Sequence, residues 1–288
     1  MTTRRQFLSN AGLLTAGAFL APHMASAKIN AKAGIQLYTL REQLPKDPKG
    51  VIAKVAQAGY KEVETFGYSK ANGFWGLSAS EFSQTLKANG LTTCSGHYGT
   101  GVETGNMAML DECIEAAKVT GQEYVIIPYL GDQYRKTASD IKSFVEKVNK
   151  AAEHAKNAGV KLGYHNHNFE FTNVGGTTLA DELLKGTSKA NFSFEMDIYW
   201  VVRSGQDPIQ WIKKYPGRFQ LVHVKDMDKG QPELNTEIGK GSIDFKKIVA
   251  EAKLAGIQHY VVEQENFKID PYISITESAK YIKNTLFA

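Results

Sequence analysis

The sequence predicts a closed parallel barrel of eight strand and helix pairs, a (βα)8 or TIM barrel, and three observations lead to that prediction. The 288-residue chain, without its first 27 residues, has the length of one such barrel. From residue 33 onward, short runs rich in Val, Ile, Tyr and Phe alternate with longer segments of helical periodicity, as in parallel sheets with crossover helices. Eight such pairs follow one another. An open doubly wound sheet is the alternative, but no glycine-rich dinucleotide loop follows the first predicted strand.

The predicted elements follow in chain order. Runs of β-branched and aromatic residues predict strands over residues 34–38, 61–66, 91–97, 123–128, 160–165, 192–197, 219–225 and 258–264. Helical periodicity predicts helices over residues 48–58, 80–89, 104–120, 138–157, 178–185, 208–214, 244–255 and 271–287. Ala-Gly pairs at 58–59, 158–159 and 255–256 end three helices, because glycine readily adopts the left-handed cap conformation. The long loops 67–79 and 227–242 follow strands, on the face where such barrels carry their active sites.

Residues 1–27 have the features of a twin-arginine signal peptide. The motif TRRQFL at residues 3–8 is followed by an apolar stretch over residues 12–20 and a small-residue cleavage site, ASA, at 25–27. The apolar stretch is too short to span a membrane. We therefore expect a periplasmic or secreted protein exported by the twin-arginine route. Its mature part, residues 28–288, should be a single barrel domain without stable membrane association.

Net charge indicates which partners to expect, and the two cysteines raise the question of a disulfide. Removal of the two leader arginines lowers the formal net charge from +4 to +2, so neither nucleic acid nor a membrane surface is an expected partner. Cys94 and Cys113 could form a disulfide in an oxidising compartment or remain buried free thiols. The sequence leaves the oligomeric state open, and a homo-oligomer is possible.

Four potential metal ligands lie at the ends of the last four predicted strands. Alternate side chains of a strand share a face, and the apolar residues around Asp197 occupy the opposite face, so Asp197 points into the barrel. The same parity directs His165, His223 and Glu263 inward. Two imidazoles and two carboxylates suit one divalent metal, Mn²⁺ first, with Zn²⁺, Co²⁺ or Fe²⁺ as alternatives, whereas Mg²⁺ prefers more oxygen ligands.

Four short runs occur in order: LGYHNH at 162–167, MDIYW at 196–200, HVKD at 223–226 and VEQ at 262–264. In these runs the sequence resembles the xylose-isomerase-like TIM barrels of the sugar phosphate isomerase/epimerase group, over nearly all of the expected mature chain. In that family a divalent metal is held by ligands from the last four strands, which implies this role for Asp197, His223 and Glu263. His165 departs from the pattern, since the sugar epimerases of the group carry there a glutamate that is both ligand and acid/base.

The expected chemistry is removal of a proton from the carbon next to a carbonyl, which yields an enediolate that a divalent metal stabilises. Glu263 is the expected base. His167 or His165 can move protons, because imidazole titrates near neutral pH. Lys225 could hold a carbonyl oxygen or pair with Glu195 or Glu265.

Further residues are candidates for binding the substrate. His97 could contact substrate hydroxyl groups or be a hydrogen-bonded structural histidine. Gln36 and Glu64 could line the pocket or form a buried structural pair. Trp200 could stack on a sugar ring or belong to the packing of the rim.

These residues predict an enzyme that acts on a small-molecule sugar, a divalent-metal-dependent sugar isomerase or epimerase. The first alternative is a metal-dependent lyase or hydrolase of 3-keto-glycosides, because phosphorylated sugars are scarce outside the cytoplasm and an enediolate can expel a β-substituent. The second alternative is a non-catalytic periplasmic carbohydrate-binding barrel. Cleavage of abasic DNA, the activity of some related barrels, is disfavoured by the ligand count and the near-neutral charge.

Overall fold

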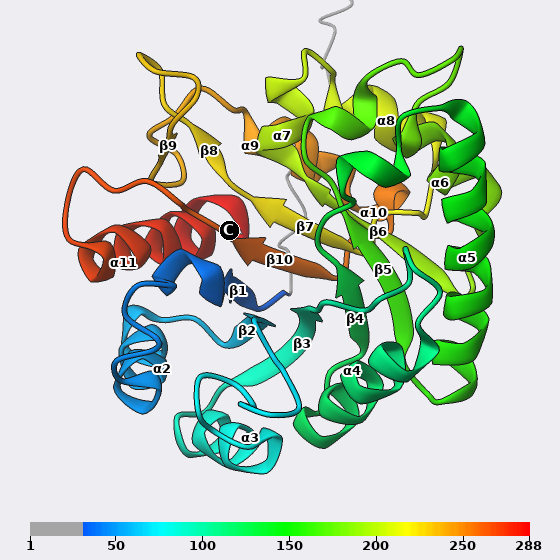
Figure 1. Ribbon diagram of the computed structural model, residues 1–288. Helices are drawn as coiled ribbons and strands as arrows, with labels where there is room; N and C mark the ends of the chain where they lie inside the picture. The colour runs from blue at the N-terminus through cyan, green and yellow to red at the C-terminus, as the bar shows by residue number, and fades with distance from the viewer. Residues whose placement is uncertain (1–30) are drawn as a thin grey trace, which may run out of the picture.

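Eight parallel strands close into one barrel in the computed structural model, which describes residues 31–288. The predicted signal peptide lies outside these residues. The strand order around the barrel is β1-β10-β7-β6-β5-β4-β3-β2, so that β10 meets β1 and leaves no sheet edge (Figure 1). The bounds are β1 (Ala33–Gln36), β2 (Glu62–Phe66), β3 (Thr92–His97), β4 (Tyr124–Ile127), β5 (Lys161–His165), β6 (Phe192–Asp197), β7 (Leu221–Val224) and β10 (His259–Val262). The predicted closed barrel is confirmed, and the open sheet is not formed.

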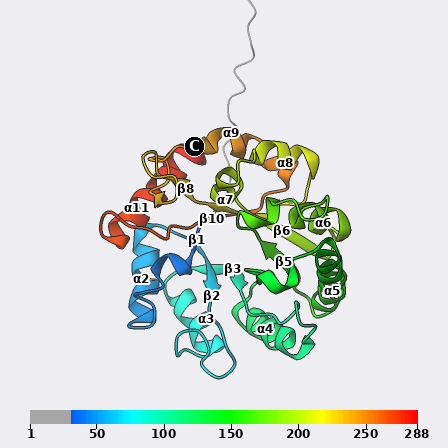
Figure 2. The ribbon, with the colours of Figure 1, turned by 45° about the horizontal axis from the view of Figure 1, so that its top comes forward.

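Helices surround the strands, as the view along the barrel shows (Figure 2). Nine of the α-helices occupy the predicted helical regions: α2 (Pro48–Ala58), α3 (Ala79–Ala88), α4 (Met107–Thr120), α5 (Ala138–Asn157), α6 (Leu179–Gly186), α8 (Pro208–Lys214), α9 (Phe245–Ala250), α10 (Ala252–Ala255) and α11 (Pro271–Tyr281). Short helical turns follow several strands or helices: η1 (Leu37–Leu40), η2 (Asp132–Tyr134), η3 (Phe169–Phe171) and η4 (Ile282–Leu286). Helix α11 packs against α2 and covers the seam between the first and last strands (Figure 1).

Three features differ from the predicted elements. An additional helix, α7 (Ile198–Arg203), begins directly after β6 because the Asp197 side chain accepts a hydrogen bond from the Trp200 backbone and caps it. The predicted helix over 244–255 is two helices, α9 and α10, which divide at Glu251. The loop after β7 contains an antiparallel pair, β8 (Asp226–Met227) and β9 (Asn235–Thr236).

Local sequence explains how the helices end. Gly59 and Gly256 adopt positive φ values of 106° and 82° at the ends of α2 and α10, a conformation that glycine reaches without steric cost. Both helices therefore stop where the Ala-Gly pairs predicted. Among the described residues, no helix combines the length and apolar character that crossing a bilayer requires.

A compact apolar layer fills the middle of the barrel. Its members point inward from four strands, β3, β4, β7 and β10, and are all buried: Cys94, Tyr124, Ile126, Leu221 and Val261. Gly163 leaves room for this layer, because a β-carbon at that position would lie 2.4 Å from the Ile126 Cδ1 atom. The layer separates the carboxyl ends of the strands from their amino ends. Cys94 and Cys113 are both free thiols, which decides the question that spacing left open.

Replacing Ile126 by Ala tests this layer. Ile126 is fully buried, and truncation in a close-packed interior should lower the free energy of unfolding by about 2–5 kcal/mol. The matched control is Ile273→Ala, since Ile273 is 55% exposed on α11 and should change stability by about 0.5 kcal/mol or less. Urea unfolding of both variants gives the comparison. Equal stability of the two would show that the layer does not hold the barrel together.

Candidate functional site

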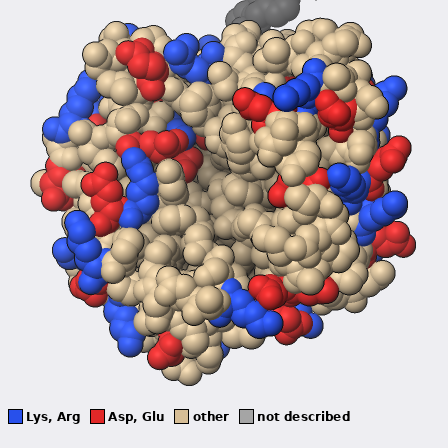
Figure 3. Space-filling model, viewed as in Figure 1, with Lys and Arg blue, Asp and Glu red and all other residues tan. Residues whose placement is uncertain are grey.

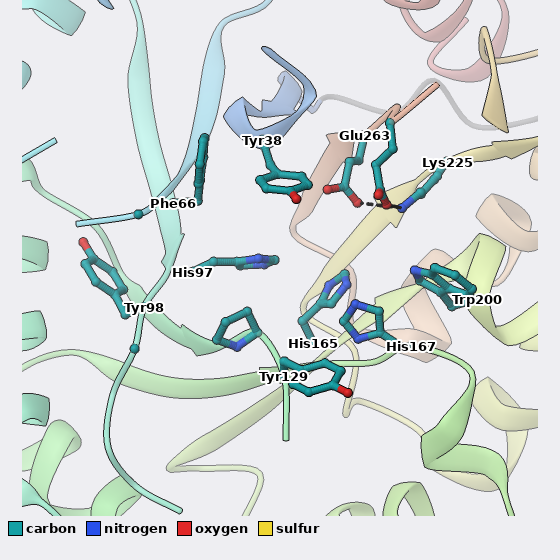
Figure 4. Close-up of a pocket in the computed structure, with 14 residues that line it drawn as sticks. Tyr38, Phe66, His97, Tyr98, Tyr129, His165, His167, Trp200, Lys225 and Glu263 are labelled. Carbon is teal, nitrogen blue, oxygen red and sulfur yellow. Dashed lines mark hydrogen bonds and ion pairs between the residues drawn. The ribbon is translucent and has the colours of Figure 1, made fainter. Parts of the chain in front are cut away.

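A cavity of about 350 Å³ opens at the carboxyl ends of the strands. The corresponding face is hollowed at its centre, and the hollow is lined mainly by residues other than lysine, arginine, aspartate and glutamate (Figure 3). Aromatic side chains and histidines dominate the wall (Figure 4). The lining residues are Tyr38, Phe66, Gly67, His97, Tyr98, Gly99, Pro128, Tyr129, His165, His167, Trp200, Lys225, Glu263 and Glu265.

Four buried side chains converge at the floor of this cavity. His165 and Asp197 are the last residues of β5 and β6, His223 lies in β7, and Glu263 follows β10. One ligand atom of each lies within 4.8 Å of the others. Strand alternation and the parallel register bring together the four residues predicted as metal ligands, and we call them the ligand set.

Each histidine of the ligand set has a carboxylate behind it. His165 Nδ1 lies 3.1 Å from Glu195 Oε2, while its Nε2 faces Asp197 Oδ2 at 3.9 Å. His223 Nε2 lies 2.6 Å from Glu64 Oε1, while its Nδ1 faces Glu263 Oε2 at 3.2 Å. A carboxylate that binds one ring nitrogen fixes the tautomer and makes the other nitrogen a better metal donor. Glu64 and Glu195 therefore orient the two imidazoles toward the centre of the ligand set.

The two supporting carboxylates share a third histidine. His97 Nε2 lies 2.8 Å from Glu195 Oε2 and 3.2 Å from Glu64 Oε1. Burial alone would lower the pKa of His97, but the two carboxylates raise it to about 9. Burial, together with the charge of Glu64, raises the pKa of Glu195 to about 7. Gln36 Nε2 donates to Glu64 Oε1 at 2.7 Å and completes the network.

Lys225 supplies a fixed positive charge beside the ligand set. It is 1% exposed, and its Nζ lies 3.1 Å from Glu263 Oε2, 3.8 Å from Asp197 Oδ2 and within ion-pairing distance of Glu265. Burial would lower the pKa of Lys225, but these carboxylates raise it well above its ordinary value. Burial raises the pKa of Glu263, whereas Lys225 and His223 together lower it below the ordinary range. Glu263 is therefore held as a carboxylate.

Unpartnered atoms show that this arrangement fits a cation. Asp197 is fully buried, and its Oδ2 atom has no hydrogen-bond partner among the described residues. The Oε1 atom of Glu195 is likewise buried without a partner there. An unpaired buried carboxylate oxygen is costly, whereas two oxygens and two oriented ring nitrogens match what divalent metals of intermediate softness require. The residues of the ligand set therefore fit the metal that the sequence predicted.

The wall opposite Glu263 carries His167 (Figure 4). Its ring stacks with Phe169 at 5.8 Å and meets Tyr129 and Trp200 at 5.5 and 5.6 Å between ring centres. Burial and the charge of Lys225 lower its pKa to about 4, so the imidazole is neutral at physiological pH. Its Nδ1 atom is buried without a partner among the described residues, as is the indole Nε1 of Trp200. Both side chains line the cavity.

The structure sorts the other predicted site residues. His97, His165, His167, Trp200, Lys225 and Glu263 line the cavity, whereas Asp197 and His223 lie directly beneath its lining. Gln36 and Glu64 are fully buried beside the ligand set and are not among the lining residues. Lys225 pairs with Glu265, one of the acids considered for it, and forms no ion pair with Glu195. Trp200 lies on α7 rather than on a strand.

Sequence reasoning considered Glu195 only as a possible ion-pair partner of Lys225 and assigned no role to Tyr129. Glu195 lies two residues before Asp197 on β6, so strand parity placed it inward, and this parity was the available signal. Tyr129 follows β4 and is 51% exposed, and no sequence pattern distinguishes it from other surface tyrosines.

Comparison with known proteins identifies the family. The sequence profile described as xylose isomerase-like TIM barrel matches residues 52–285. The chain belongs to this family. The fold and the family resemblance predicted from the sequence are thereby confirmed.

The chain is similar both to solved structures and to curated enzymes. A crystal structure of a sugar phosphate isomerase/epimerase from Parabacteroides distasonis ATCC 8503 has 28% sequence identity and a TM-score of 0.79, covering 91% of this chain and 97% of that one. An inosose dehydratase of Clostridium perfringens is 29% identical over 175 residues, which are 54% of this chain and 58% of the relative. The chain thus spans little more than half the length of such curated relatives. A D-psicose 3-epimerase has a TM-score of 0.67 at 14% identity, which shows the shared fold alone.

Replacing Glu195 by Gln tests the support of the ligand set. The amide keeps the shape of the side chain but removes the charge behind His165, so the affinity for Mn²⁺ should fall about 10–100-fold. Competition with a chelator measures this affinity without reference to activity. The control is Glu115→Gln, an exposed change on α4. Unchanged affinity in the Glu195 variant would remove Glu195 from the metal centre.

The burial of Glu170 should make the stability of the protein depend on pH. Glu170 is fully buried beneath His167, accepts hydrogen bonds from Tyr164 Oη and His167 N, and burial raises its pKa from 4.5 to about 8. Folding therefore favours the protonated acid, and this contribution to stability is complete below about pH 4.5 and is lost as the pH rises through about 8. Glu170→Gln should lack that loss. Unfolding of the chelator-treated protein at several pH values, with exposed Glu153→Gln as the control, would contradict this if the two variants followed the same curve.

Proposed function

We propose that this protein is a divalent-metal-dependent enzyme that removes a proton next to the carbonyl of an unphosphorylated keto sugar and then expels the β-substituent, as a lyase or dehydratase does. The observation that carries this proposal is the ligand set, in which one ionised carboxylate, Glu263, both faces the cavity and belongs to the metal site. A bound divalent metal, with Mn²⁺ preferred, would polarise the carbonyl and stabilise the negative charge of the enediolate. The remaining chemistry falls to residues of the chain.

The charge of the cavity supports an unphosphorylated substrate. Lys225 is the only lysine or arginine among the lining residues, and it is already bound to Glu263, Glu265 and Asp197. The positive charge of His97 is likewise paired with Glu64 and Glu195. A phosphate group would need free arginine, lysine or backbone donors, and it would also approach two carboxylates. Action outside the cytoplasm, which the predicted export signal would bring about, agrees with such a substrate.

Glu263 is positioned to act as the base. The contacts to His223 Nδ1 and Lys225 Nζ involve its Oε2 atom, so the Oε1 atom is free to take the proton from carbon. The electron pair of the broken C–H bond then forms the double bond of the enediolate. Lys225 lies where its ammonium group can donate to the developing oxygen anion.

The choice of elimination rests on the wall opposite Glu263. Epimerisation needs a second group that returns a proton to the other face of the enediolate, and the sugar epimerases of the family use a second carboxylate for it. Here that position is His165, which binds Glu195 and faces the ligand set. When the carbonyl re-forms, the bond between the β-carbon and its oxygen breaks, and that oxygen takes up a proton by way of His167 or water. Curated relatives named inosose dehydratase support this outcome.

Isomerisation or epimerisation of a sugar is the second candidate. It shares the same first step and is supported by the structure named sugar phosphate isomerase/epimerase, which matches almost the whole chain. In this case His167, which lines the cavity and whose Nδ1 has no hydrogen-bond partner among the described residues, would relay a proton from water to carbon, and Glu263 would release to solvent the proton that it took.

Hydrogen exchange tests the proposal and separates the two candidates. The purified protein, loaded with Mn²⁺, should exchange the proton next to the carbonyl of 3-keto-glycosides in deuterated water, and chelation should stop the exchange. An unsaturated ketone and a released alcohol would indicate elimination, whereas an isomeric keto sugar would indicate the second candidate. Bound metal without exchange on any keto sugar would contradict both, and absence of metal and exchange together would favour the carbohydrate-binding barrel.

Glu263→Gln tests the base. Loss of a general base should lower the exchange rate about 10²–10⁴-fold, while the remaining three ligands retain metal with weaker affinity. Glu265→Gln is the matched control, because Glu265 lines the same cavity but lies outside the ligand set, and this variant should still exchange. Full exchange in the Glu263 variant would show that another group removes the proton.

A further inference from the structure

The amino end of the barrel holds a second cluster of metal-ligating side chains. Glu62 and His259 are the first residues of β2 and β10, and Cys94 points inward from β3. One ligand atom of each lies within 4.8 Å of the other two. In the barrel order β1 lies between β10 and β2, so the cluster spans the seam where the first and last strands meet.

Two of the three groups already form an ion pair. His259 Nδ1 lies 2.8 Å from Glu62 Oε2, so a cation inserted between them would take over a contact that exists. Cys94 is 2% exposed, and its Sγ atom lies 3.2 Å from Ser95 Oγ. Burial and the neighbouring charge of Glu62 raise the pKa of the Cys94 thiol. The thiol is therefore neutral unless a cation lies beside it to favour the thiolate.

The donor set differs from that of the ligand set in the cavity. A thiolate, an imidazole and a carboxylate are typical of Zn²⁺ and of its spectroscopic substitute Co²⁺, and they suit Mn²⁺ and Mg²⁺ poorly. Three protein ligands leave a fourth tetrahedral position for water. The His259 side chain is 13% exposed, which gives a cation access from the amino end of the barrel.

The apolar layer separates the two sites. Cys94 packs in this layer with Ile126, Leu221 and Val261, while Glu64 and the ligand set lie on the other side, toward the cavity. On the side of the amino ends, the Tyr124 ring packs edge-on against His259 at 5.8 Å, and Tyr124 Oη donates to Gln258 Oε1. These contacts hold the imidazole over the cluster.

We propose that Glu62, Cys94 and His259 bind a second divalent cation, Zn²⁺ or Co²⁺, which links β2, β3 and β10 across the closing seam of the barrel. Such a cation would stabilise the fold, because the site exists only when the three strands are paired and binding to the folded state alone shifts unfolding. The proposal is independent of the reaction at the cavity.

Co²⁺ titration of the metal-free full chain tests the proposal. A thiolate ligand gives a charge-transfer absorption in the near ultraviolet, and the ligand set in the cavity contains no cysteine. The wild-type protein should therefore show this absorption, and Cys94→Ser should lose it together with one equivalent of bound metal. Cys113→Ser, which changes the other cysteine, should retain the absorption. Absence of the absorption from the wild-type protein, or its persistence in Cys94→Ser, would overturn the proposal.

Two further variants distinguish metal binding at the seam from metal binding at the cavity. Asp197→Asn should weaken metal binding at the cavity and leave the thiolate absorption intact, so failure of one site is distinguished from failure of the other. His259→Gln keeps Cys94 and the apolar layer unchanged and should weaken Co²⁺ binding at the thiolate site at least about tenfold. Zn²⁺ should raise the melting temperature of Asp197→Asn but not that of Asp197→Asn combined with His259→Gln. Equal shifts in the two proteins would exclude the seam site.

Discussion

The site depends on the burial of several carboxylates in one small volume. Glu64, Glu195, Asp197 and Glu263 are each at most 5% exposed, and burial of like charges is tolerated only when cations or donated hydrogen bonds compensate. His97 supplies positive charge beside Glu64 and Glu195, and Lys225 supplies it beside Asp197 and Glu263. The rings of His165 and His223 lie between these two pairs of carboxylates. Asp197 Oδ2 and Glu195 Oε1 accept no hydrogen bond from the described residues. The buried carboxylates thus offer more acceptor atoms than the described residues supply donors for. This is the physical reason why the arrangement fits a divalent cation.

The barrel makes this concentration of charge possible. Ile126, Leu221 and Val261 fill its middle with apolar side chains, which exclude water arriving from the amino end and keep the charged groups of the ligand set at the carboxyl ends of the strands. The parallel strands then present their last residues at one end, so that side chains distant in sequence meet there. Glu64 and His223, 159 residues apart, lie 2.6 Å from each other.

The strand-end ligands could be predicted from the sequence because the two-residue alternation of a strand is rigid. Once Asp197 and His223 were placed on strands, their direction followed. The carboxylate behind His223 could not be predicted in the same way, since the contact of Glu64 with His223 joins β2 and β7, which are not neighbours in the barrel. Such contacts depend on the curvature of the closed sheet. Helix α7 was missed because Asp197 both ends a strand and caps a helix.

His165 has a carboxylate directly behind it, and this keeps negative charge close to the ligand set. Where the sugar epimerases of the family carry a glutamate ligand, this chain has a neutral imidazole, but Glu195 binds the far ring nitrogen. The carboxylate is therefore retained one level deeper, where it can strengthen the donor nitrogen but cannot reach a substrate in the cavity. The cavity keeps one ligand carboxylate, Glu263, that can take a proton from carbon. This arrangement agrees with the proposed elimination, because epimerisation needs a second group that returns a proton to the other face of the enediolate, whereas elimination does not.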